Sequence, residues 1–294
     1  MQRLYLFALL LLLAGLAGCS GTHLAYNNAD IVLRWMANDY FSLEGVQEED
    51  FKTRLAHFHA WHRSEELPRY GALMTGAGDK LADGLTAQEL VWGWNSVNTR
   101  YRRMAAQAAP ELAAVLVTLT PAQFERLEKR FAESDAEFAK KHLKGGEAEQ
   151  RARRDQRNLD LMREWFGDLS DAQEAQLTSA SATLPLLYVL RLQNRQRRQG
   201  EFIALLKAFR SAAELEPRLK QWLTEWEEGA SPEYRRLSEL HRRLYIQMLL
   251  ELDRGLAPAQ RVHAVARLNE YAEIFNALAD QAGAVGSLNA ADAR

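Results

Sequence analysis

The sequence predicts an all-α protein, an irregular bundle of roughly eight to ten helices. Three observations support this fold class. Apolar residues recur at three-, four- and seven-residue steps through most segments after residue 26. No stretch shows the sustained alternation of apolar and polar residues, flanked by turns, that predicts paired strands. Helix-start patterns recur at the breaks between the segments, and glycines stand near the opposite ends.

The chain begins with the layout of a secretory signal peptide. Arg3 supplies a positive charge, Leu4–Leu16 is apolar throughout, and small residues precede Cys19, the only cysteine. The apolar run is too short for a comfortable membrane span. We therefore expect a leader, a short tether, one helical domain and a frayed tail. These four parts are residues 1–18, 19–25, 26–282 and 283–294.

Three segments show the helical stripe most clearly, and each carries charged residues between its apolar positions. The stripes are Phe124, Leu127, Phe131 and Phe138 in 121–143; Leu237, Leu240, Leu244, Met248 and Leu252 in 232–254; and Val262, Val265, Leu268, Phe275 and Leu278 in 258–280. Each segment is long enough to pack one face against the rest of a bundle.

The helix starts share one local pattern, most complete in Leu119–Gln123. Thr120 is placed to cap the helix, and Gln123 to bond back to the cap amide, as in a capping box. Leu85–Glu89 repeats this pattern, while Leu169–Gln173 and Leu256–Gln260 keep parts of it. The intervals between the starts are unequal, which excludes a solenoid of fixed period.

Composition excludes several classes of function. The formal net charge is −2, so the chain has no overall field that would favour nucleic acid or an anionic membrane. Cys19, the only cysteine, lies at the end of the predicted signal peptide, so the rest of the chain has no thiol for a disulfide or for thiolate catalysis. No GxSxG, SxxK, HExxH or phosphate-binding glycine loop is present. We therefore predict a protein that is not an enzyme and needs no cofactor.

Two groups of residues suggest chemistry. His57, His59 and His62 include a pair one turn apart that zinc could use, but His57 points away from the others on a straight helix. The expected arrangement is a packed His62 with solvated neighbours. Adjacent carboxylates such as Glu65 and Glu66 do not face each other on a helix, so we expect them to be solvated.

Two basic stretches suggest a binding surface. Residues 140–163 mix basic and acidic side chains, which favours pairing within one helix. The second stretch, residues 191–198, contains fewer acidic residues than the first and interrupts an otherwise apolar helix. Its arginines are the candidate binding surface, either as a polar face or as part of a groove between helices: Arg191, Arg195, Arg197 and Arg198. Tryptophans such as Trp92 and Trp94 could line a pocket, although at helical spacing they more often pack between helices.

The tetrad Leu16-Ala17-Gly18-Cys19 resembles the lipobox of bacterial lipoproteins. This resemblance implies cleavage before Cys19, thioether lipidation of its sulfur and usually acylation of the new N-terminus. An ordinary signal peptide is the alternative. Ser20, in place of Asp, favours transfer to the outer membrane by the same resemblance, with the inner membrane as the other possible site. Two or three acyl chains would hold the protein permanently on a bilayer.

The segment Tyr26-Asn27-Asn28-Ala29-Asp30, with Arg34-Trp35 and Asp39-Tyr40-Phe41 after it, resembles an uncharacterised family of Gram-negative lipoproteins. The resemblance covers the whole chain and implies a helical periplasmic lipoprotein, without implying an activity. From the residues alone, we expect Asn27 to cap the first helix and Tyr26 to contact Ile31 in a hydrophobic staple. Arg34 is expected to pair with Asp30 or with a carboxylate from another helix.

Leu119–Gln123 also resembles the Leu-Thr-x-x-Gln motif of small periplasmic stress chaperones. Leu169–Gln173 and Leu256–Gln260 match it in part, and Leu43–Gln47 lacks the threonine. Because a capping box explains the same residues, this resemblance supports only an alternative function.

The sequence thus predicts an outer-membrane lipoprotein on the periplasmic face, which acts as a binding or scaffold module for another envelope protein or component. A holdase-like chaperone or envelope-stress factor is the alternative. A metal-dependent enzyme that uses the three histidines is a third, weaker hypothesis. Nucleic acid is not an expected partner.

Overall fold

The computed structural model describes residues 19–291, with side chains described for residues 22–281. The predicted leader, residues 1–18, lies outside the described residues. Within the described range the chain forms helices, turns and loops with no strand, so the predicted all-α fold class is confirmed. None of the described helices is both long enough and apolar enough to cross a bilayer.

The helices follow the chain in one continuous order. Their bounds are α2 (Cys19–Asn27), α3 (Ala29–Phe41), α4 (Val46–Trp61), a π-helical turn (His62–Glu66), α5 (Leu67–Ala82), α6 (Ala87–Leu116), α7 (Pro121–His142), α8 (Glu147–Phe166), α9 (Asp171–Ala182), α10 (Tyr188–Ala208), α11 (Ala212–Thr224), α12 (Pro232–Arg254) and α13 (Pro258–Ala291).

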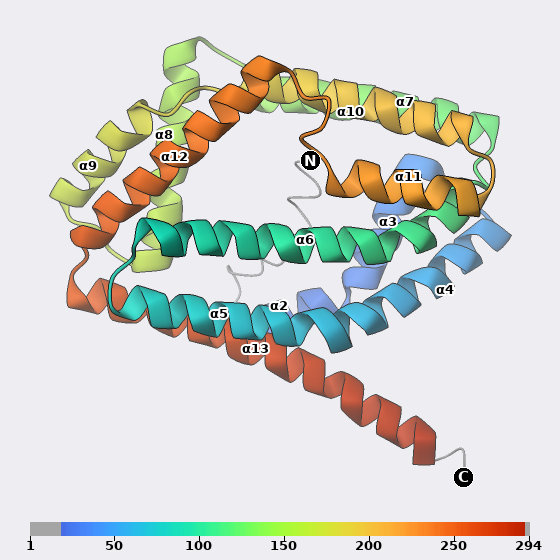
Figure 1. Ribbon diagram of the computed structural model, residues 1–294, viewed down its shortest axis with the longest axis horizontal. Coiled ribbons are helices and arrows are strands. Elements are labelled where there is room, and N and C mark those ends of the chain that lie inside the picture. Colours follow the sequence, from blue (N-terminus) through green and yellow to red (C-terminus); the bar gives the residue numbers. More distant parts are fainter. Residues whose placement is uncertain (1–18, 292–294) are drawn as a thin grey trace.

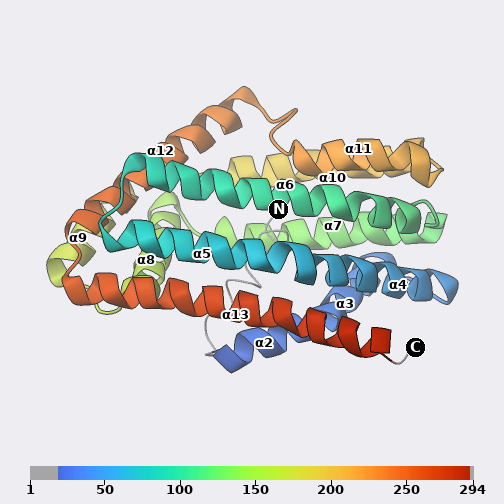
Figure 2. The same cartoon turned by 60° about the horizontal axis from the view of Figure 1, so that its bottom comes forward.

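The bundle is elongated and open in outline (Figure 1). Helices α5, α6 and α13 run along one side, and α7 and α10 run along the other. One end is made by α8, α9 and α12, and the opposite end by α3, α4 and α11 (Figures 1 and 2). Helix α2 lies against α13, so the first and last helices of the described chain share one side of the molecule.

The closest helix pairs depend on small residues. Helix α5 lies along α13, where Gly71 faces the Asn276 amide and a Cβ at position 71 would require that side chain to move. In the main core, the alanine ridge of α6 packs against α11. The ridge residues Ala105, Ala109 and Ala113 are at most 5% exposed. A ridge of alanines brings the two helix axes close and buries the leucines of α11.

The predicted capping boxes form at three helix starts. Thr86, Thr120 and Ser170 each accept from the N3 amide, while the N3 side chain accepts from the cap amide. At the start of α13, Gln260 Oε1 accepts from the Ala257 amide at 2.9 Å, although alanine offers no side-chain cap in return. The local sequence pattern therefore fixes where these helices begin.

Two of the helix starts pair with two others through glutamines. At one end of the molecule, Gln123 Nε2 donates to Gln47 Oε1 at 2.8 Å, and Gln47 Nε2 donates back to Gln123 Oε1 at 3.2 Å. At the other end, Gln173 and Gln260 bond each other in the same way, at 2.8 and 3.0 Å. Each side-chain amide also donates to a backbone carbonyl just before the helix that carries the other glutamine. Taken in the order Gln123, Gln47, Gln173 and Gln260, these carbonyls belong to Ser42, Thr118, Gly255 and Asp168. We call these two pairs the glutamine junctions.

Both chain ends of the domain differ from the sequence prediction. The predicted tether, residues 19–25, belongs to α2, and residues 283–291 of the predicted tail belong to α13. Because the chain is already helical at Tyr26, Ile31 lies on the opposite face of the helix. Tyr26 is 6% exposed and Ile31 53%, so the predicted staple between them is wrong.

Candidate functional site

The candidate site surrounds the π-helical turn between α4 and α5. Pro68 stands at the start of α5 and has no N–H, so it cannot bond the carbonyl of Ser64 four residues earlier. In an ordinary α-helical turn the Pro68 ring would also clash with that carbonyl. The wider π-helical turn relieves this clash and keeps α4 and α5 as one bent helix. It also turns His62 and Glu66 toward the interior, where they are 2% and 0% exposed. Two titratable side chains are therefore buried within one turn.

His62 lies between two tyrosine hydroxyl groups. Its Nδ1 is 2.9 Å from Tyr26 Oη, and its Nε2 is 3.3 Å from Tyr70 Oη. Burial, with smaller contributions from nearby His59 and Arg63, lowers the pKa of His62 to about 4. The ring is therefore neutral near pH 7, with one nitrogen as donor and the other as acceptor. Burial also raises the pKa of both tyrosines, so all three groups are uncharged.

Glu66 is the buried charge beside this chain of hydrogen bonds. Its Oε1 is 2.9 Å from Arg103 Nε and 3.6 Å from Arg100 Nη1, while both arginines reach partly into solvent. Burial raises the pKa of Glu66, and the two arginines oppose that shift. Arg103 also bonds Glu65 at 3.1 Å. The carboxylate therefore ties the π-helical turn to the middle of α6.

The same turn holds the anchor helix α2. Arg63 Nη2 donates to Asn27 Oδ1 at 2.7 Å, and its guanidinium lies 5.0 Å from the centroid of the Tyr26 ring. Its Nη1 donates to the Leu278 carbonyl of α13 at 3.2 Å. With the Tyr26–His62 bond, these contacts join α2, the π-helical turn and α13. We call this group the anchor cluster: Tyr26, Asn27, His62, Arg63, Glu66, Tyr70 and Arg103.

The anchor cluster is arranged for attachment. His62 lies between hydroxyl groups of α2 and α5, and Glu66 Oε1 pairs with Arg103 of α6, while Glu66 Oε2 is buried without a hydrogen-bond partner. His57 is exposed and lies apart from the other two histidines. The His59 ring packs against Tyr26 at a tilted angle, with ring centroids 4.8 Å apart, and is only partly exposed, so the expectation that it is solvated is wrong. No three described His, Cys, Asp or Glu side chains are grouped to hold one metal ion.

The four arginines of the predicted binding surface do not share one exposed face. Arg195 bonds Asp135 and Ser134 of α7, and Arg197 pairs with Glu201 on its own helix. Arg198 is 7% exposed, donates to the Trp222 carbonyl at 2.8 Å and lies over the Trp222 ring. Only Arg191 is exposed. These arginines do not form one exposed polar face, because α10 packs between α7 and α11, whose side chains and carbonyls bond Arg195 and Arg198.

The other groups singled out in the sequence have local partners. Arg151 and Arg153 in the 140–163 stretch pair with glutamates one turn back, as predicted for one solvated helix face. Trp92 lies under Lys80 at 4.8 Å, while Trp94 of the same helix is 47% exposed. The tryptophans therefore contribute to separate contacts between elements and to the surface.

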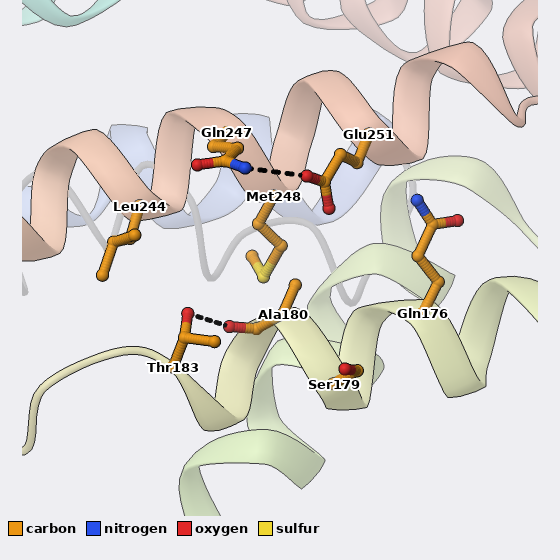
Figure 3. Close-up of a pocket in the computed structure, with 8 residues that line it drawn as sticks. All are labelled: Gln176, Ser179, Ala180, Thr183, Leu244, Gln247, Met248 and Glu251. Carbon is orange, nitrogen blue, oxygen red and sulfur yellow. Dashed lines mark hydrogen bonds between the residues drawn. The ribbon is translucent and has the colours of Figure 1, made fainter.

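A shallow groove between α9 and α12 is the second candidate (Figure 3). Its volume is about 340 Å³, and its lining residues are Gln176, Ser179, Ala180, Thr183, Leu244, Gln247, Met248 and Glu251. The Met248 side chain forms the apolar floor and is 1% exposed. On the rim, the Gln247 amide donates to Glu251 at 3.0 Å, and the Thr183 hydroxyl donates to the Ala180 carbonyl. Hydrogen-bonding groups around an apolar floor suit a partner of mixed polarity.

Sequence reasoning missed the anchor cluster and the groove. The one local signal for the cluster is Leu67-Pro68 inside an otherwise helical segment, which marks a distortion four residues earlier. The groove has no local signal, because α9 and α12 are far apart in the sequence.

One comparison with known proteins gives a match. The model of a family of unknown function (DUF6279) matches residues 39–235. No curated protein and no solved structure matches the chain.

Proposed function

Since the chain belongs to the family of unknown function DUF6279, we propose its function from its own residues: a lipoprotein of the cell envelope. Lipid on Cys19 would attach it to the periplasmic face of the outer membrane, and the helical domain would act as a scaffold that binds another envelope component. In this proposal the protein is not an enzyme.

One observation carries the proposal. Cys19 lies in helix α2, and seven residues later Tyr26 bonds the buried His62 at 2.9 Å. A lipid on Cys19 would therefore be joined to the domain by a helix that is itself held in place, and not by a loose tether. A domain held in this way keeps a constant orientation on the membrane, which suits a scaffold that presents one surface to a partner.

The groove between α9 and α12 supports the binding part of the proposal. It lies at the end of the molecule formed by α8, α9 and α12, away from α3 and α4 (Figures 1 and 2). Gln176, Ser179 and Gln247 on its rim are exposed and offer hydrogen-bond donors and acceptors. We therefore place partner binding at this groove, in place of the arginines of α10.

The test combines lipid labelling with position-specific crosslinking in intact cells. We expect radiolabelled palmitate in the wild-type protein and none in Cys19→Ala, which also leaves the membrane fraction. A photo-crosslinkable residue at position 247 should capture one partner, while the same residue at the exposed position 221 of α11 should not. A Cys19→Ala protein that matures and localises unchanged contradicts the anchor, and equal capture at both positions contradicts the groove.

A holdase-like role is the second candidate, favoured by the exposed apolar side chains of α6. Trp94 and Val97 are 47% and 54% exposed on the first half of that helix. An unfolded client binds such apolar surface. If this is the function, the Cys19→Ser protein suppresses aggregation of a denatured client, and Trp94→Ser weakens that suppression.

A further inference from the structure

The outward face of α2 and α3 carries a stripe of apolar side chains. Leu24, Ile31 and Trp35 are 66%, 53% and 65% exposed, and the neighbouring Val32 is 37% exposed. A step of four residues places Ile31 and Trp35 on one side of α3, and Leu24 is exposed on α2, which ends at Asn27 before α3 begins. We call these four residues the apolar stripe.

The packing of α2 and α3 fixes the direction in which the apolar stripe points. On the opposite side, Thr22 and Tyr26 are 3% and 6% exposed, and Tyr26 is held by the anchor cluster. Further along, Ala37 and Tyr40 pack against the main core. Because the inner face is occupied by these contacts, rotation of the helices cannot bury the stripe in the domain.

We infer that the apolar stripe lies in the bilayer surface and works as a second membrane contact beside the lipid on Cys19. This inference rests on the proposed lipid anchor for its location, since the stripe begins five residues after Cys19 on the same helix. An amphipathic helix that lies in the membrane plane buries its apolar face among the headgroups and upper acyl chains. The domain is then held at two places on one side.

The side chains suit this location. Tryptophan favours the membrane–water interface, and leucine and isoleucine favour the acyl region below it. The stripe itself holds no charged residue. The charges nearest in sequence, Asp30 and Arg34, pair with each other at 3.5 Å. The stripe therefore fits a lipid surface without requiring anionic headgroups.

A second copy of the chain is the competing occupant. A stable protein interface needs about 800 Å² on each partner, which is far more than four partly exposed side chains provide. A lipid surface needs no such area, because a covalent lipid already supplies most of the membrane affinity. The stripe thus suits an accessory lipid contact better than a dimer interface.

The test measures the depth of one stripe residue in vesicles. The lipidated protein uses its only native thiol at Cys19, so Ile31→Cys or Val262→Cys introduces a single site for a polarity-sensitive fluorophore. Val262 is 68% exposed at the start of α13, near the end of the molecule opposite α3, and is the matched control. The vesicles are phosphatidylethanolamine with phosphatidylglycerol, with and without brominated acyl chains.

We expect brominated lipid to quench the fluorophore at position 31 severalfold more than at position 262. Equal quenching at the two positions overturns the inference while the lipid anchor remains in place. Crosslinking of two copies through position 31, with no quenching, overturns it in favour of a dimer.

A second measurement separates the stripe from the anchor. In the Cys19→Ser protein, which carries no lipid, Ile31→Ser with Trp35→Ser should lower the vesicle partition coefficient about tenfold. Val189→Ser with Val262→Ser, which removes two exposed residues elsewhere, should leave it unchanged. If palmitate labelling fails but this tenfold difference is found, the result supports membrane contact by the apolar stripe and contradicts lipidation of Cys19. If the two double variants bind vesicles equally well, the inference that the apolar stripe contacts the bilayer is contradicted, whether or not Cys19 is lipidated.

Discussion

The glutamine junctions and the anchor cluster both bury polar groups between helices, but they do so with different chemistry. At the junctions, neutral amides bond each other and backbone carbonyls, and Gln123 and Gln173 are each 8% exposed. In the anchor cluster, the buried groups include a histidine with a pKa of about 4 and a carboxylate whose pKa is raised by burial. The contribution of the glutamine junctions to stability therefore does not depend on pH, whereas that of the anchor cluster does.

This difference separates two tasks. An amide pair with its donors and acceptors bonded has no charged form, so it holds helix starts together under any ordinary condition. A buried ionisable group adds stability only while its protonation state matches the folded arrangement. The protein therefore places proton-insensitive contacts at the two ends of the bundle, and proton-sensitive contacts where α2 joins the domain.

The largest expected effect that distinguishes the two regions is the pH dependence of His62. Its pKa is about 4 in the folded state, below the ordinary 6.5 that the unfolded chain should show. Between these values the unfolded state binds the extra proton, so stability is fully present above pH 6.5 and falls as the pH drops to 4. Between pH 7 and pH 4, the free energy of unfolding of His62→Gln should therefore fall by about 3 kcal/mol less than that of the wild type. Urea unfolding at a series of pH values measures this difference.

His57→Gln is the matched control, because His57 is exposed on the same stretch of helix. Burial also lowers the pKa values of His142 and His241 to about 4, but both residues remain in every variant, so their contributions cancel. A wild-type pH dependence in His62→Gln would contradict the assignment of the proton-sensitive contact to this residue.

A smaller effect should follow from the ion pair of Glu66. Arg103→Gln leaves the fully buried carboxylate with only the longer Arg100 contact, and we expect a loss of about 2 kcal/mol in the free energy of unfolding. In a Glu66→Gln background the same change should cost less than half as much, since no buried charge is then left unpaired. Both values come from urea unfolding at pH 7.

Arg242→Gln removes the surface pair with Glu239 and should cost at most about 0.5 kcal/mol. If Arg103→Gln costs the same amount in the wild-type and Glu66→Gln backgrounds, the arginine acts through its contacts with Glu65 and Trp61, and the anchor cluster has no charge dependence at this point.

The sequence predicted the local half of the junctions and none of their pairing. Thr120 and Gln123 stand at capping-box spacing, and the predicted box forms. That Gln123 then bonds Gln47, 76 residues earlier, depends on how α4 and α7 pack, and no local pattern carries that information. Leu43–Gln47 is an incomplete motif because Glu44 stands where Leu119–Gln123 has Thr120, and the residue before α4 is Gly45, which has no side chain to cap the helix.

The candidate site was less predictable than the fold. His62 was expected to be packed, and it is, but the partners Tyr26 and Tyr70 come from α2 and α5. The arginines of α10 were expected to form a surface because their spacing shows only that they share a helix, and not which neighbours take up their hydrogen bonds. Helical periodicity predicts which elements form, whereas the partners of a buried polar group depend on tertiary packing.

The smallest expected effect is at the glutamine junctions, where removal of one amide should cost stability equally at all pH values. Gln123→Ala removes the bonds to Ser42, Gln47 and the Thr120 amide, and we expect a loss of about 1 kcal/mol. Gln221→Ala, at an exposed position of α11, is the control and should stay within about 0.5 kcal/mol of wild type. The comparison with the anchor cluster is tested by repeating both measurements at pH 7 and pH 4. The difference between the two variants should not change, because no junction amide gains or loses a proton. A junction whose contribution varied with pH would mean that its stability depends on the anchor cluster, and the two regions would then have to be treated as one.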